Sequence, residues 1–94
     1  MKKTISLVHE KKILARLIEG AKHDVKKYIK RERNKDLPEG VDYWDFDCKY
    51  GENEANAQTI HLSEINKYID EAEKQELKSF YIEVIAKHGV RSKD

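Results

Sequence analysis

Hydrophobic residues recur along the chain with two different periods, and the changes of period divide it into predicted elements. Residues Lys3 to Val8 alternate, with Ile5 and Leu7 on one side, which predicts a short strand. Apolar residues then recur at three- and four-residue steps from Ile13 to Ile29, the spacing of an amphipathic helix. This helix must end before Pro38, because a residue ahead of proline is pushed out of the helical conformation.

The stretch Leu37 to Glu54 contains four aromatic residues, the only tryptophan and the only cysteine. Within it apolar and polar residues alternate, so a strand over 43–50 has one apolar face, made of Trp44, Phe46, Cys48 and Tyr50. The opposite face carries Tyr43, Asp45, Asp47 and Lys49. We therefore predict that the tryptophan side lies under the helices and that the aspartates face outward.

The second half of the chain predicts two further strands and a helix. Residues 55–61 are a weak strand candidate, and Ser63 can cap a helix whose apolar stripe runs from Ile65 to Ala72, with His61 as a local helix-start residue. Residues Phe80 to Ala86 alternate again, and Gly89 ends that strand.

The resulting order is β-α-β-β-α-β in a single domain of residues 1–94, which places the chain in the α+β class. Two helices on one face of an antiparallel sheet give the ferredoxin-like split βαβ arrangement. In that arrangement the third strand is central, and the second and fourth strands are opposite edges. A three-stranded variant, with 55–61 as a loop, is the alternative.

The runs KRERNKDLPEGVDYWDFDCKYGENEA and IHLSEINKYIDEAEKQELKSFYIEVIAKHG together cover most of the chain. They resemble a family of small uncharacterised bacterial proteins classed as a domain of unknown function, and Leu37 to Cys48 is the most specific part. The resemblance implies an intact bacterial domain. It transfers no catalytic or binding residue, because the family has no established activity.

Composition excludes several classes of protein. Charged residues make up 39% of the chain and apolar residues 38%, and one cysteine cannot form a disulfide within the chain. The longest apolar runs are far shorter than the roughly 20 residues of a membrane span. We therefore expect a cytoplasmic protein without a membrane partner.

The net charge of +1 hides a separation of charge along the chain. Residues 22–35 contain seven Lys or Arg against two acids, and residues 36–58 contain seven acids against one lysine. Six basic residues are candidates for contacting nucleic acid or a ribonucleoprotein: Lys26, Lys27, Lys30, Arg31, Arg33 and Lys35. If residues 30–35 are helical, they extend about 9 Å beyond the core. The alternative is a solvated helix end neutralised by Asp36, Glu39 or Asp42.

Two other surfaces are candidates. Asp45 and Asp47 point the same way about 7 Å apart, so with Asp42 they could hold a cation or serve as an acid/base pair; otherwise they form a charged solvent face. The open sheet face offers Val8, Tyr43, Tyr81 and Ile85 for contact with a protein or a second copy of the chain.

Motifs of enzymes are missing from the sequence. It has no glycine-rich phosphate loop, and the four histidines lack the spacing of a zinc site. Cys48 falls on the apolar face and is expected to be a small buried residue rather than a nucleophile. We expect a non-catalytic binding or adaptor module without a cofactor.

Overall fold

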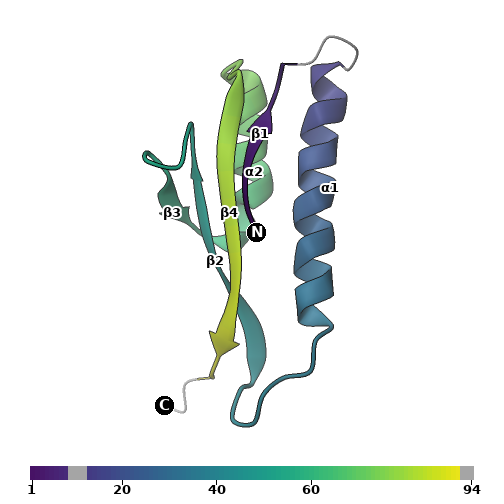
Figure 1. Cartoon of the computed structure of the whole chain (residues 1–94), viewed down its shortest axis with the longest axis vertical. Helices are drawn as coiled ribbons and strands as arrows, with labels where there is room; N and C mark the ends of the chain where they lie inside the picture. Colours follow the sequence, from purple (N-terminus) through teal and green to yellow (C-terminus); the bar gives the residue numbers. More distant parts are fainter. Residues whose placement is uncertain (9–12, 92–94) are drawn as a thin grey trace.

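The computed structural model describes residues 1–8 and 13–91, so His9 lies outside the described residues. Its elements follow the predicted order (Figure 1). They are β1 (Lys2–Ser6), α1 (Leu14–Arg33), β2 (Tyr43–Gly51), β3 (Gln58–Ile60), the 3₁₀ turn η1 (Leu62–Glu64), α2 (Ile65–Lys74) and β4 (Ser79–Gly89). The α+β class and the β-α-β-β-α-β order are thus confirmed.

The four strands form one antiparallel sheet in the order β1-β4-β2-β3. Each βαβ unit is split: β4 lies between β1 and β2, and β2 lies between β3 and β4. The strand order nevertheless differs from the ferredoxin-like prediction. The third strand is an edge rather than central, and the second and fourth strands are central neighbours. The three-stranded variant is also wrong, because β3 pairs with β2.

Strand composition explains which strands are central. In β4, Phe80, Ile82 and Val84 are completely buried, and a strand this apolar is stabilised by neighbours on both sides. The edge strand β1 carries Lys2 and Lys3, and β3 has only Ile60 directed at the core. Short or lysine-bearing strands are typical of sheet edges, where they discourage pairing with other chains.

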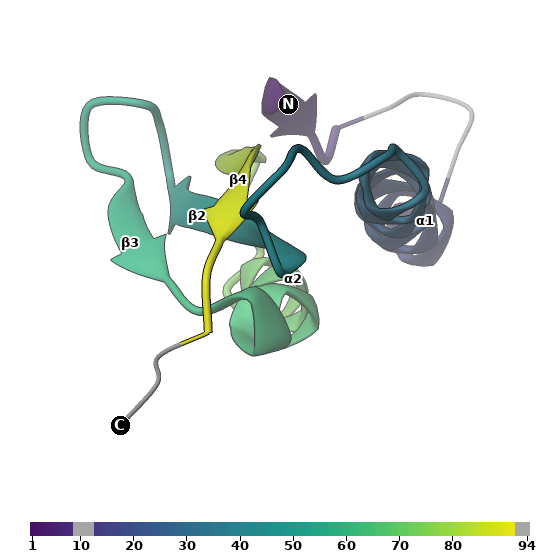
Figure 2. The ribbon, with the colours of Figure 1, turned by 90° about the horizontal axis from the view of Figure 1, so that it is seen from below.

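Both helices lie on the same side of the sheet, as the view from below makes clear (Figure 2). The core between them combines Ile18, Ala21 and Val25 of α1, Ile65, Ile69 and Ala72 of α2, and the inward side chains of the strands. Within residues 1–8 and 13–91, neither helix combines the length and the apolar character that a membrane crossing requires.

The predicted faces of β2 are confirmed. Phe46 and Cys48 are buried under the helices, while Asp47 is exposed on the opposite face. Trp44 is only partly buried. Its indole Nε1–H donates a hydrogen bond to the carbonyl oxygen of Lys35 at 2.9 Å, which ties β2 to the segment that follows α1.

The last turn of α1 does not extend beyond the core, contrary to the prediction. Glu32 is only 9% exposed, and the guanidinium of Arg33 lies 5.6 Å from the centre of the Phe46 ring. The reason is the length of the sheet. The eleven residues of β4 span about 36 Å, so the sheet runs alongside all 30 Å or so of the twenty-residue helix.

Candidate nucleic-acid interface

The six basic candidates do not form one surface. Lys26, Lys30 and Arg33 lie on the side of α1 that turns toward α2, where Lys22 completes a stripe at four- and three-residue steps. Lys27 and Arg31 lie on another side of the helix, with the Arg31 guanidinium 5.6 Å from the Tyr28 ring centre.

Lys35 follows the helix and is neutralised locally. Its ammonium lies 2.7 Å from Oε2 of the largely buried Glu32. The structure therefore separates the six candidates into three residues of the stripe, two residues on another side of the helix, and Lys35, which is paired with Glu32.

The stripe forms one wall of an open groove of about 780 Å³ between α1 and the start of α2. We call this the basic groove; its walls are Lys22, Lys26, Lys30 and Arg33 on α1, and His61, Ser63 and Asn66 on η1 and α2. Ile29 of α1 and Leu62 of the opposite wall form an apolar floor, beneath which Val25 and Ile65 are buried in the core. The result is a concave surface with a cationic rim.

Among the described residues, a carboxylate pairs with only one of the four cations on the wall of the basic groove. None of the described residues that line it is Asp or Glu. Lys22 pairs with Asp70, whereas Lys26, Lys30 and Arg33 form no ion pair within residues 1–8 and 13–91. A groove of this kind concentrates positive potential at its centre.

The acidic segment after α1 does not neutralise the basic helix end. Asp42 uses its Oδ2 to accept a hydrogen bond from the Arg91 backbone N–H at 2.7 Å. Asp36 and Glu39 are exposed and form no ion pair in the described part of the chain. None of these three acids forms an ion pair with a basic residue of the helix end in the described part of the chain.

The second wall of the groove is held in place by a capping box. The His61 Nδ1 accepts a hydrogen bond from the Ser63 backbone N–H at 3.2 Å, and the Glu64 Oε1 accepts one from the His61 backbone N–H at 3.1 Å. His61 is confirmed as the helix-start residue, whereas the predicted Ser63 cap is wrong. The reciprocal bonds satisfy backbone donors at this helix start and tie His61 to Ser63 and Glu64.

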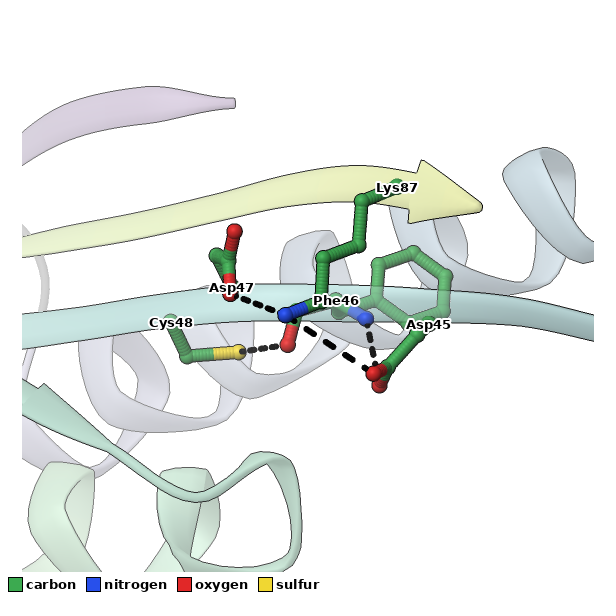
Figure 3. Close-up of polar contacts among 5 residues, drawn as sticks. All are labelled: Asp45, Phe46, Asp47, Cys48 and Lys87. Atoms are coloured by element: carbon green, nitrogen blue, oxygen red, sulfur yellow. Dashed lines mark hydrogen bonds and ion pairs between the residues drawn. The ribbon is translucent and has the colours of Figure 1, made fainter. Parts of the chain in front are cut away.

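The paired aspartates already have a cationic partner on the neighbouring strand (Figure 3). The Lys87 ammonium lies 2.6 Å from Asp47 Oδ1 and 3.8 Å from Asp45 Oδ2. The hydrogen bond to Asp47 raises the pKa of Lys87. Asp42 does not join this pair, since it binds the Arg91 backbone. Among residues 1–8 and 13–91, no three His, Cys, Asp or Glu side chains gather where they could hold a metal ion.

Cys48 is buried as predicted, with 1% of its surface exposed. Burial, followed by the negative charges of Asp47 and Asp45, raises the pKa of its thiol to about 11. A thiol that is both covered and protonated at neutral pH does not act as a nucleophile.

The four candidates for protein contact do not form a continuous patch. Val8 is 64% exposed and Tyr43 40% exposed, but they lie near opposite ends of β4, about 33 Å apart along that strand. Ile85, between them, is half-buried. Charged residues such as Glu83 and Lys87 occupy neighbouring positions on this face.

Tyr81 is 3% exposed, so the expectation that it lies open on the sheet face is wrong. It pairs with Gly51, and the backbone of Asn56 and Ala57 lies directly over Gly51 on the same face. The Tyr81 hydroxyl donates to Glu83 Oε1 at 2.8 Å, and this bond, followed by burial, raises the pKa of the phenol to about 12.

Sequence reasoning missed half of the groove. Lys22 could have been found, because it precedes Lys26 and Lys30 at four-residue steps. The residues Leu62, Ser63 and Asn66 carry no local signal, since only the packing of α2 beside α1 brings them near the stripe.

Comparisons with known proteins give one finding about the relationship of this chain to others. No curated protein and no solved structure matches it. The family model of DUF6172 matches residues 1–94, the whole length of the sequence. The chain therefore belongs to DUF6172, a family of unknown function.

Proposed function

We propose that this domain is a non-catalytic module that binds nucleic acid, alone or within a ribonucleoprotein, through the basic groove. The observation that carries the proposal is the set of three cations, Lys26, Lys30 and Arg33, which face a groove without carboxylates and have no ion-pair partner in the described chain. Such groups bind phosphates through charge and hydrogen bonds that are independent of base sequence.

The proposal includes the bacterial cytoplasm as the setting. The resemblance carried by Leu37 to Cys48 supports a bacterial source. A single, buried cysteine fits a reducing compartment.

The affinity should be modest and strongly salt-dependent. Three phosphate contacts to a single strand give a slope of log K against log salt of about −2, since each contributes about −0.7. Raising the salt from 50 to 200 mM should then weaken binding about 20-fold. Fluorescence anisotropy with labelled RNA and DNA oligonucleotides measures this slope.

The triple variant Lys26→Gln, Lys30→Gln, Arg33→Gln should lose most of the binding and its salt dependence. The matched control is Lys27→Gln, Arg31→Gln, Lys49→Gln, which removes the same charge from exposed positions outside the groove. Equal losses in the two variants would refute a localised site, and wild-type protein that binds no oligonucleotide at 50 mM salt would refute the function. Circular dichroism of both variants checks that the fold is retained.

Protein contact or homodimerisation through the open sheet face is the alternative. Its support is weaker, because Tyr81 is covered and the exposed Val8 and Tyr43 are far apart. A concentration-dependent mass in sedimentation experiments, abolished by Tyr43→Ser, would favour this alternative.

A further inference from the structure

We infer that the basic groove is built for a single strand of nucleic acid rather than a duplex, with phosphates along α1 and bases over the apolar floor. This inference rests on the proposed function and adds to it the strandedness, the orientation and the length of the ligand. Three features of the groove carry it: the spacing of its cations, its floor and its second wall.

The cations follow a line. Lys22 is paired with Asp70, and from Lys26 to Arg33, the three cations without an ion-pair partner in the described residues, the helix rises about 10 Å. A stacked strand advances about 3.4 Å per nucleotide, so these three cations match about three nucleotides. The Arg33 end of this line is held against the ring of Phe46, which restricts where its guanidinium can move.

The apolar floor favours exposed bases. The partly exposed Ile29 and Leu62 side chains lie between the cationic rim and the second wall, where they can contact the faces of unpaired bases. A duplex buries its base faces in its own stack and presents only phosphates and groove edges. Duplex binding would therefore leave this floor uncovered.

The second wall can hydrogen-bond bases without adding charge. Asn66 carries a neutral donor and acceptor of the kind that pair with base edges. Ser63 Oγ lies 2.8 Å from His61 Nδ1, which leaves its lone pairs as acceptors for a base. The His61 imidazole uses Nδ1 in the capping box, so its Nε2 is the ring nitrogen that remains for a ligand. Because the capping box holds this wall, little order has to be created on binding.

An acidic peptide is the main competitor, since it could also place carboxylates on the stripe and apolar side chains on the floor. The even cation line and the amide and hydroxyl groups opposite it favour a phosphate chain with bases on one side. The experiment therefore includes a peptide arm, with a glutamate-rich peptide that carries leucines as the probe.

The test measures anisotropy with fluorescein-labelled oligo(dT) and oligo(rU) of two to ten nucleotides, and with a blunt duplex carrying the same number of phosphates, all at 50 mM salt. We expect affinity to rise with length up to about three nucleotides and then to level off. We expect the single strands to bind at least tenfold more tightly than the duplex.

The variant Asn66→Ala separates this inference from the proposed function. Removing one hydrogen bond should weaken single-strand binding about two- to tenfold, leave duplex binding unchanged and keep the same salt slope, because the slope counts phosphate contacts. Asn56→Ala, at an exposed site in the β2–β3 connection, is the matched control and should have no effect.

The outcomes distinguish the two proposals. If single strands and duplex bind equally and Asn66→Ala has no effect, while the Lys26, Lys30 and Arg33 variant loses binding, the single-strand inference is overturned and the proposed function stands. If only the glutamate-rich peptide binds, both are overturned. Shifts of the Leu62, Ser63 and Asn66 amide signals on titration with dT5 would support the placement of the strand.

Discussion

The same substitution, glycine to alanine, should have opposite effects at two positions of this fold. At Gly51, the last residue of β2, an added Cβ would lie 2.7 Å from the Ala57 Cα and 2.8 Å from the Ala57 nitrogen. Both are backbone atoms, so the β2–β3 connection would have to move. At Gly20, inside α1, an added Cβ would meet no atom within 4 Å.

The expected magnitudes follow from these distances. Forcing the connection away from β2 resembles overpacking, which costs about 1–3 kcal/mol. In a domain of this size that corresponds to a fall in Tm of about 5–15 °C. Gly20→Ala should instead stabilise the domain by about 1 kcal/mol, because alanine favours the helix over glycine, and should raise Tm by about 5 °C.

Thermal and urea unfolding followed by circular dichroism measure both effects, and Trp44 fluorescence provides a second probe of the same transition. Gly20→Ala serves as the control for the substitution itself. If Gly51→Ala were as stable as Gly20→Ala, the β2–β3 connection could not lie against β2. The assignment of Tyr81 as a residue buried beneath that connection would then be wrong as well.

Two further predictions concern β2. Burial raises the pKa of the Cys48 thiol to about 11, so the contribution of this thiol to the free energy of unfolding is full below pH 9 and is lost as the pH rises from 9 to 11. The difference in the free energy of unfolding between wild type and Cys48→Ala, measured by urea titration, should therefore shrink over that interval. A constant difference would refute this assignment. Trp44→Phe removes the hydrogen bond to the Lys35 carbonyl and should cost about 0.5–1.5 kcal/mol by circular dichroism, whereas a loss above about 3 kcal/mol would mean that Trp44 acts mainly through packing.

Local patterns were sufficient to identify the elements and their faces. The alternation in β2 separates Phe46 and Cys48 from Asp45 and Asp47 because side chains along a strand point to opposite sides, whatever the strand pairs with. The apolar residues of α1 predict the buried side of the helix, because residues three and four positions apart lie on the same face. The cationic stripe itself is also a local pattern, and its charge could be identified before any folding.

The sequence by itself therefore determined the class, the order of the elements and the inward face of each. Tertiary structure decided the strand order, since an alternating pattern does not specify the neighbours of a strand. The complete burial of Phe80, Ile82 and Val84 is a consequence of the central position of β4 beneath both helices. Tertiary structure also decided which basic residues face a groove, because Leu62 and Asn66 approach Lys26 only when α2 packs beside α1 on the shared core. Contacts between distant segments depend on how all the apolar faces are buried together, and no single segment encodes that arrangement.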